Sequence, residues 1–274
     1  MNNRLQEPAS GFLKAKTYRT EAEKTMQVAT TTFIMFEHKI EPVRKLSGDS
    51  DAAAVLRIVT RNALSGWELV EACGDELHIP VLIFRRLPAG TPAPRYLVEE
   101  VPTIAGEDEI HTVSSYLWLM YDRSWLPVCV MDSPFSRPVA VFKLSNTSKN
   151  PVELQLLPVS LDLFGKGTVS IVYELLDQQI TRNLTLQCIM HGGVYPILVL
   201  TTKDVDTNYT YLVDHAKGNA FTNQSTTLAD LINERTNNGW EVCGAFEDWF
   251  LWPCVAFRRP TDSPPVVPLN ISSK

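Results

Sequence analysis

Two short motifs of this chain contain residue types that hold phosphate or stabilise an oxyanion in enzymes. Gly165-Lys166-Gly167-Thr168 has the residues that end a phosphate-binding loop, in which backbone N–H groups and a helix N-terminus hold an anion. The upstream glycine of such a loop is missing, because position 160 is Ser160. His191-Gly192-Gly193 would suit an oxyanion loop, but no Gly-x-Ser-x-Gly nucleophile accompanies it. We therefore predict an ordinary helix start and a tight hairpin turn.

The histidines and carboxylates show no arrangement typical of a catalytic centre. The 5 histidines lack His-x-x-x-His spacing, and none pairs with a cysteine at a metal-ligand spacing. Glu68 and Glu241 follow equivalent tryptophans and could form an acid–base pair, but their identical placement favours a structural role, such as accepting hydrogen bonds near a helix end. We predict a non-enzymatic protein without cofactor or metal, and a metal site assembled from distant repeats stays open as an alternative.

Composition and charge argue against several classes of protein. With 274 residues, 45% of them hydrophobic, the chain is large enough for a sizeable core. A formal charge of −6 disfavours nucleic acid and anionic membrane surfaces as partners. No stretch approaches about 18 uninterrupted apolar residues, so we expect no direct membrane insertion. The 5 cysteines lie in apolar runs without a Cys-x-x-Cys pair, which predicts buried thiols and a cytoplasmic location.

A tryptophan motif occurs twice and indicates an internal duplication. Gly66-Trp67-Glu68 is followed by a short apolar stretch, a polar turn and a second apolar stretch, 80–86. Gly239-Trp240-Glu241 is followed in the same way by 253–259. In both copies a proline lies 13 residues after the tryptophan and a phenylalanine lies 17 residues after it. Shared residue types at shared spacing are typical of a repeat.

Two fainter copies lie between these. Trp125 is followed by Pro138 and Phe142 at the same distances, and Leu184 takes the tryptophan position in a copy whose proline, Pro196, comes one residue early. The residues 12, 9 and 8 positions before each anchor are apolar at helical spacing: Val55, Ile58, Val59, Val113, Tyr116, Leu117, Val172, Leu175, Leu176, Leu228, Leu231 and Ile232. Each copy therefore predicts a strand, a helix and a two-stranded hairpin.

We predict an α+β protein built from four tandem β-α-β-β repeats, with about four main helices. The predicted repeats span 28–90, 91–149, 150–203 and 204–261, between an N-terminal arm, 1–27, and a C-terminal tail, 262–274. Seams rich in proline and serine at 88–94 and 145–151 separate the first three repeats, as linkers do.

The Gly-Trp-Glu units, each with an opening aromatic strand, a helix and a closing Phe-Arg-Arg strand, resemble a family of small bacterial domains of unknown function that typically carry a single unit. The likeness is good for the first and fourth repeats, whereas Ser124-Trp125-Leu126 and Asn183-Leu184-Thr185 replace the motif in the other two. The resemblance implies the β-α-β-β fold and a bacterial origin. It implies no site, because the family has no established activity.

The closing strands of the repeats are apolar at every position instead of alternating, at 81–84, 139–142, 197–200 and 254–257. Such strands are covered on both faces. One helix covers one face, so the other face must pack on a neighbouring repeat. We therefore expect antiparallel sheets packed on one another, in pairs or in one closed pseudo-oligomeric assembly, with the anchor tryptophans sealing helix against sheet.

The hairpin loop of the last repeat is rich in aromatic residues. Phe246, Trp249, Phe250 and Trp252 are typical anchors of protein interfaces, although they could equally cover the core of a neighbouring repeat. We hypothesise a scaffold or accessory subunit of a larger assembly, which binds protein partners or itself through hairpin loops and terminal arms. The alternative is a small-molecule binding or sensing module with an apolar pocket between repeats.

Overall fold

The computed structural model describes residues 37–74, 80–102, 109–133, 136–145, 154–159, 167–180, 184–192, 195–202, 208–216, 224–248 and 252–261. All of them belong to the larger of the two units into which the chain divides, 34–274. The arm and the tail that the sequence predicts, 1–27 and 262–274, lie outside the described residues. Within the described ranges, no helix has both the length and the apolar character needed to span a membrane.

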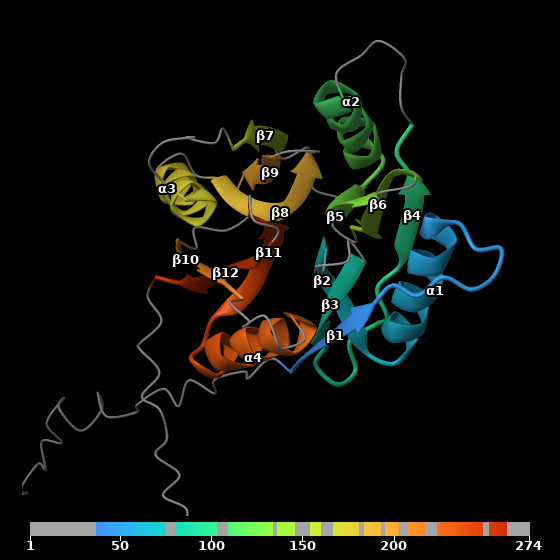
Figure 1. Ribbon diagram of the computed structural model, residues 1–274, viewed down its shortest axis with the longest axis horizontal. Helices are drawn as coiled ribbons and strands as arrows, with labels where there is room; N and C mark the ends of the chain where they lie inside the picture. Colours follow the sequence, from blue (N-terminus) through green and yellow to red (C-terminus); the bar gives the residue numbers. More distant parts are fainter. Residues whose placement is uncertain are drawn as a thin grey trace, which may run out of the picture. The chain divides into compact units, whose positions relative to one another are not determined.

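The elements follow one another in the order β-α-β-β, four times in succession (Figure 1). Segment 1 consists of β1 (His38–Pro42), α1 (Asp51–Leu64), β2 (Trp67–Gly74) and β3 (Pro80–Arg86). Segment 2 consists of β4 (Tyr96–Glu100), α2 (Glu109–Asp122), β5 (Trp125–Ser133) and β6 (Ser136–Leu144). Segment 3 consists of β7 (Leu154–Pro158), α3 (Thr168–Ile180), β8 (Leu184–Gly192) and β9 (Tyr195–Thr202). Segment 4 consists of β10 (Tyr209–His215), α4 (Gln224–Asn237), β11 (Glu241–Glu247) and β12 (Pro253–Pro260), and the α+β class is confirmed.

The last strand of each segment, its closing strand, lies between the two other strands of that segment in the sheet. The strands β3, β6, β9 and β12 each pair antiparallel with the two other strands of their segment. Segments 1 and 4 form three-stranded sheets, whereas segments 2 and 3 join in one sheet of order β4-β6-β5-β8-β9-β7. The join is a parallel contact of β5 with β8, at Val130 and Met190. The expectation of antiparallel sheets is wrong at this join, because the apolar pattern of a strand does not specify which edges meet.

Local sequence explains where α1 begins and ends. Ser50 Oγ accepts a hydrogen bond from the N–H of Ala53 at 3.1 Å and caps the helix, which is a common role of serine at this position. Gly66, just after the helix, has a φ of 78°, which favours a residue without a Cβ. Gly239 (φ 81°) and Ser124 (φ 64°) have the same conformation at the equivalent places. The glycine of the Gly-Trp-Glu motif therefore forms the turn from helix to strand.

The closing strands are buried on both faces, as their composition predicts. In β3, Leu82 and Phe84 pack in a core shared with segment 2, whereas Val81 and Ile83 pack in a core shared with segment 4. The same alternation between two cores occurs in β6, β9 and β12. Successive side chains of a strand point to opposite faces, so an apolar run serves two cores at once.

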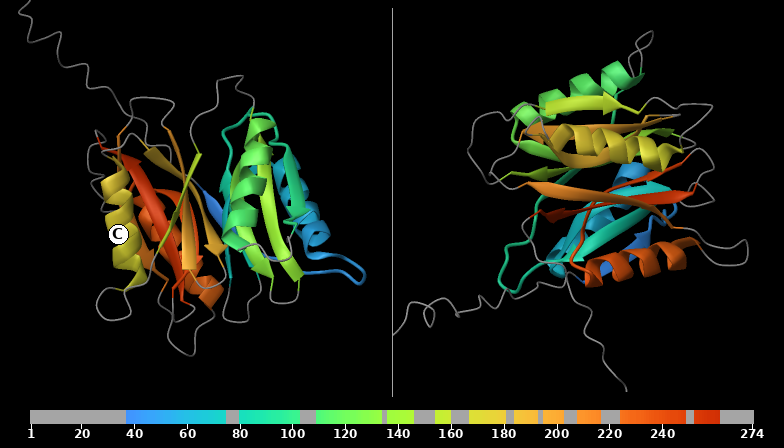
Figure 2. Two further views of the ribbon diagram at one scale, coloured as in Figure 1. Left: turned by 90° about the horizontal axis from the view of Figure 1, so that it is seen from above. Right: turned by 90° about the vertical axis from the view of Figure 1, so that its left-hand side faces the viewer.

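Four cores connect the segments in a closed cycle. Segment 1 shares one core with segment 2, segment 2 another with segment 3, segment 3 another with segment 4, and segment 4 another with segment 1. Each core contains one helix: α1 in the core of segments 1 and 2, α2 in that of 2 and 3, α3 in that of 3 and 4, and α4 in that of 4 and 1. The four helices lie on the outer side of the strands in Figure 2. Trp67 is 9% exposed in the first of these cores, and Trp125 and Trp240 pack at the edges of two others.

We expect Leu82→Ala and Ile83→Ala to destabilise the protein to a similar degree. Each change removes a fully buried side chain from a different core, which costs about 2–5 kcal/mol of unfolding free energy. Leu64→Ala, at a residue that is 78% exposed, should change it by about 0.5 kcal/mol or less. Urea denaturation measures the unfolding free energy of all three variants. If one side of the sheet faced solvent, either Leu82→Ala or Ile83→Ala would lower it no more than Leu64→Ala does.

Candidate functional site

The second strands of the four segments, β2, β5, β8 and β11, lie beside one another near the middle of the view in Figure 1. The strands β2 and β8 each contact both β5 and β11. Each of these four strands has a β-bulge where it pairs with the closing strand of its segment. A bulge changes the direction in which a side chain points. The residues at the four bulges all line one pocket: Val70, Val128, Gln187 and Cys243. All four segments therefore contribute to this pocket.

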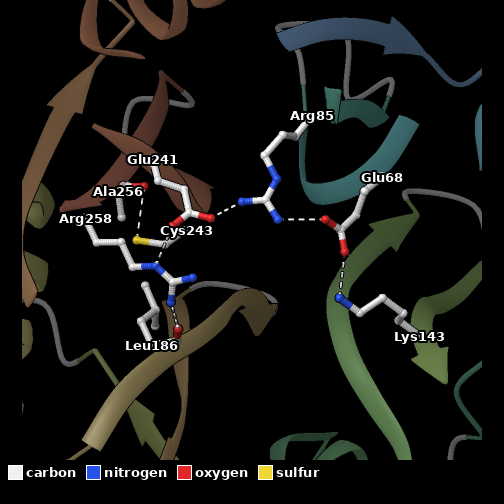
Figure 3. A network of polar contacts seen from close by, with 8 residues as sticks. All are labelled: Glu68, Arg85, Lys143, Leu186, Glu241, Cys243, Ala256 and Arg258. Atoms are coloured by element: carbon white, nitrogen blue, oxygen red, sulfur yellow. Dashed lines mark hydrogen bonds and ion pairs between the residues drawn. The ribbon is translucent and has the colours of Figure 1, made fainter. Parts of the chain in front are cut away.

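A row of five charged side chains of alternating sign lines the pocket (Figure 3). Lys143 Nζ lies 2.7 Å from Glu68 Oε1, and Arg85 Nη2 lies 2.6 Å from Glu68 Oε2. Arg85 also pairs with Glu241, which in turn lies 3.2 Å from the Nε of Arg258. The row joins side chains of segments 2, 1 and 4, and Arg258 continues it to segment 3 by donating to the backbone carbonyl of Leu186 at 3.4 Å.

Strand register explains the acidic and basic residues of the repeated motif. Glu68 lies opposite Arg85 in the β2–β3 ladder, and Glu241 lies opposite Arg258 in the β11–β12 ladder. Lys143 lies opposite an apolar residue, Leu126, and binds Glu68 of segment 1 instead. The expectation that the two glutamates accept hydrogen bonds near a helix end is therefore wrong: they accept from basic side chains across the strands.

Electrostatics favour the charged forms of three members of this row. Burial disfavours the Glu68 carboxylate, but Lys143 and Arg85 outweigh burial and lower the pKa of Glu68. Burial likewise disfavours the Arg85 and Arg258 guanidinium groups, but the carboxylates beside them outweigh it and raise their pKa values. Glu68, Arg85 and Arg258 are thus held in their charged forms by the ion pairs between strands.

A second carboxyl, that of Glu71, lies in the protein interior next to the bulge of β2. Its side chain is 0% exposed. One carboxyl oxygen accepts the N–H of Ala72 at 3.0 Å, and the other accepts the N–H of Ile189 at 3.0 Å. The N–H of Ala245 also donates to the carboxyl. Glu71 therefore joins backbone groups of segments 1, 3 and 4.

Burial raises the pKa of Glu71 well above its ordinary value of 4.5, although the three backbone N–H groups lower it in part. Cys129 and Cys188 occupy the position of Glu71 in segments 2 and 3, directly after the bulge. Burial first, and the charge of Glu71 second, raises the pKa of both thiols. The centre of the molecule therefore favours neutral side chains.

The size of the pocket limits what it can hold. Its volume of about 90 Å³ is well below the roughly 300–1,000 Å³ of clefts that hold drug-sized ligands. The space suits a few water molecules or a small ion. The apolar pocket between repeats stays a prediction. The lining of the present pocket is charged, because cross-strand pairing directs charged side chains to this place.

The aromatic residues that the sequence singles out have different positions in the fold. Phe246 is 0% exposed and packs in the core of segments 3 and 4, so its ring covers a core and is not available as a partner anchor. Trp252 is half-buried, and its backbone N–H donates to Asp248 Oδ1 at 2.9 Å. Trp249 and Phe250 lie outside the described residues.

Sequence reasoning missed the charged row and the interior carboxyl. One signal for Glu71 was present, because it interrupts the otherwise apolar stretch 69–73. For the charged row, the sequence shows a glutamate after the tryptophan and an arginine after the phenylalanine in segments 1 and 4. Only the strand register shows that these charges meet. The prediction of buried thiols is confirmed, since none of the five cysteines forms a disulfide and all are buried: Cys73, Cys129, Cys188, Cys243 and Cys254.

No family model, curated protein or solved structure matches this chain. The likeness of the Gly-Trp-Glu units to a bacterial domain family therefore stays a prediction, as does an origin of the four segments by duplication.

We expect Glu71 to lower the stability of the protein as pH rises. Because its pKa is raised in the folded state, the folded protein retains a proton that the unfolded chain releases above about pH 4.3. The unfolding free energy of the wild type, minus that of Glu71→Gln, should therefore fall as pH increases above this value. Urea denaturation of both proteins from acidic to neutral pH measures the difference.

Glu68→Gln is the matched control. The pKa of Glu68 is lowered in the folded state, so its stabilising contribution should be present at neutral pH and be lost as pH falls through the folded pKa. The two glutamates, three positions apart, should thus give slopes of opposite sign. Equal slopes would contradict the assigned environments.

Proposed function

We propose that the protein is a non-enzymatic binding module that holds a small anion in the pocket between its segments. The observation that carries the proposal is the row of charges, which begins with Lys143 and ends with Arg258. Its three cations face two carboxylates, so the row has a formal surplus of one positive charge. One monovalent anion, such as a small carboxylate or phosphate, would balance it.

The chemistry of the row supports this choice. Guanidinium groups bind carboxylate and phosphate oxygens with charge-assisted hydrogen bonds. The pairs with Glu68 and Glu241 hold Arg85 and Arg258 in fixed positions, so little conformational entropy is lost when a ligand binds. The small volume of the pocket excludes larger ligands. The free, buried thiols support a reducing compartment, and we propose the bacterial cytoplasm as the setting.

We expect acetate or inorganic phosphate to raise the melting temperature at constant ionic strength, and Lys143→Gln to weaken this binding. Loss of one charged hydrogen bond of about 1.5–3 kcal/mol corresponds to about a tenfold to hundredfold weaker affinity. Titration calorimetry measures the affinity. Arg61→Gln is the matched control, since it also removes one cation of an ion pair, with Glu41, but lies away from the pocket. Binding that is absent, or equal in Lys143→Gln, would refute the proposal.

A second function, that of a scaffold or accessory subunit, is favoured by the outer face of α2. Trp118 is 39% exposed and the adjacent Leu119 is 46% exposed. Tyr121 packs edge-on against Trp118, with ring centroids 6.2 Å apart. Aromatic side chains on a surface are typical of interfaces. We propose that this face, rather than Phe246, contacts a second copy of the chain.

We expect the wild type to self-associate with increasing concentration and Trp118→Ser/Leu119→Ser to stay monomeric. The two changes remove the apolar contact area without touching a core. Sedimentation velocity measures the mass. Leu56→Ser/Leu64→Ser, on the exposed side of α1, is the control and should behave as the wild type. A wild type that is monomeric at all concentrations would rule out self-association through this face.

A further inference from the structure

Three side chains of the kinds that bind metal ions lie together at one end of the segment 4 sheet. His215 on β10 lies opposite Cys254 on β12 in the strand ladder, and Asp248 follows the end of β11. Their ligand atoms all lie within 4.8 Å of one another. Two paired strands and the residue that follows a third strand thus supply the three ligands. The three residues do not follow a metal-ligand spacing in the sequence.

The surrounding hydrogen bonds hold the group in place. Asp248 Oδ2 lies 2.9 Å from His215 Nε2, and Asp248 Oδ1 accepts the N–H of Trp252 at 2.9 Å. The Cys254 thiol points to the carbonyl of Trp252 at 3.4 Å. The side chains of His215 and Asp248 are 24% and 8% exposed, so an ion can reach the group from solvent on the histidine side.

The other three segments show that the fold does not require these residues. The residue that follows the proline of the closing strand is Val81, Val139 or Ile197 in segments 1 to 3 and Cys254 in segment 4. The residues opposite them in the strand ladders are Pro42, Glu100 and Pro158, in place of His215. A branched apolar side chain therefore satisfies packing at this position. Cysteine and histidine meet across the strands in segment 4 alone among these described positions.

We propose that His215, Asp248 and Cys254 form a binding site for a zinc(II) ion. Imidazole nitrogen, carboxylate oxygen and thiolate sulfur are the ligands that zinc takes in proteins. Tetrahedral zinc with bonds of about 2.0–2.3 Å separates its ligand atoms by roughly 3.3–3.6 Å. The present separations, from 2.9 Å to at most 4.8 Å, reach that range by side-chain rotation. Three protein ligands leave a fourth position for water or an external ligand.

A nucleophilic cysteine is the competing interpretation of the same three residues. Reactive cysteines lie in electropositive, partly exposed surroundings. Cys254 is 0% exposed, and its sulfur lies within 4.8 Å of a carboxylate oxygen of Asp248. A dication beside the sulfur compensates the negative charges of thiolate and carboxylate together, which favours the metal site.

Cobalt(II) titration of the full-length, chelator-treated chain tests the site, because a thiolate bound to cobalt absorbs in the near ultraviolet and tetrahedral cobalt absorbs in the visible. We expect one equivalent to give both absorptions and one equivalent of zinc to abolish them. Cys254→Val, which installs the residue found at Val81 and Val139, should fold and lose the thiolate absorption. His215→Gln should lose the tetrahedral spectrum at one equivalent.

Cys243→Ser is the matched control. Cys243 is also a buried thiol of the same hairpin that donates to a backbone carbonyl, that of Ala256, but it lies at the pocket end of β11. This variant should bind cobalt as the wild type does. A wild type without thiolate absorption, a Cys254→Val or His215→Gln protein with the wild-type spectrum, or equal loss in Cys243→Ser would each overturn the proposal. Circular dichroism confirms that each variant is folded.

Discussion

The burial of each closing strand on both faces is the constraint on which the rest of the structure depends. Alternate residues of β3, such as Leu82 and Ile83, enter two different cores, so segment 1 cannot bury its apolar surface without two neighbours. A buried aliphatic side chain contributes about 1.5–3 kcal/mol, which is lost if either neighbour is missing. The cycle closes where segment 4 packs on segment 1, and closure brings the four second strands together around one junction. The pocket and the interior carboxyl are consequences of that closure.

Four segments of one chain can differ at the junction in a way that four identical subunits cannot. After the bulge, the four segments carry Glu71, Cys129, Cys188 and Gly244. A Cβ at Gly244 would lie 2.7 Å from Ile189 Cδ1, so any side chain here would force Ile189 to shift. Four glutamates here would bury four carboxyl groups close together, with a desolvation cost for each and repulsion between them. A single glutamate instead accepts N–H groups of three segments.

Differences between the segments also distinguish the two proposed sites. At the pocket, segments 1 and 4 each have a cross-strand ion pair of glutamate and arginine. Segment 2 has only a basic residue, Lys143, and segment 3 has Thr185 opposite Thr201. The five side chains of the row thus comprise three cations and two carboxylates. At the other end of segment 4, His215 and Cys254 replace residues that merely pack in the other segments. Residues that are alike at equivalent positions of the four segments thus build the fold. Residues that differ between the segments form the two proposed sites.

The sequence by itself determined the local elements of this protein. Apolar residues at helical spacing, capping at Ser50, the glycine turn at Gly66 and the uninterrupted apolar closing strands each depend on neighbours in the chain, so α+β elements with doubly covered strands could be predicted. The tertiary structure alone decided which edges and faces meet. The parallel join of β5 with β8, the burial of Phe246, the pairing of Arg85 with Glu241 and the meeting of His215, Asp248 and Cys254 all depend on strand register and on how the cycle closes. Those contacts join residues far apart in the chain, and no local pattern specifies them.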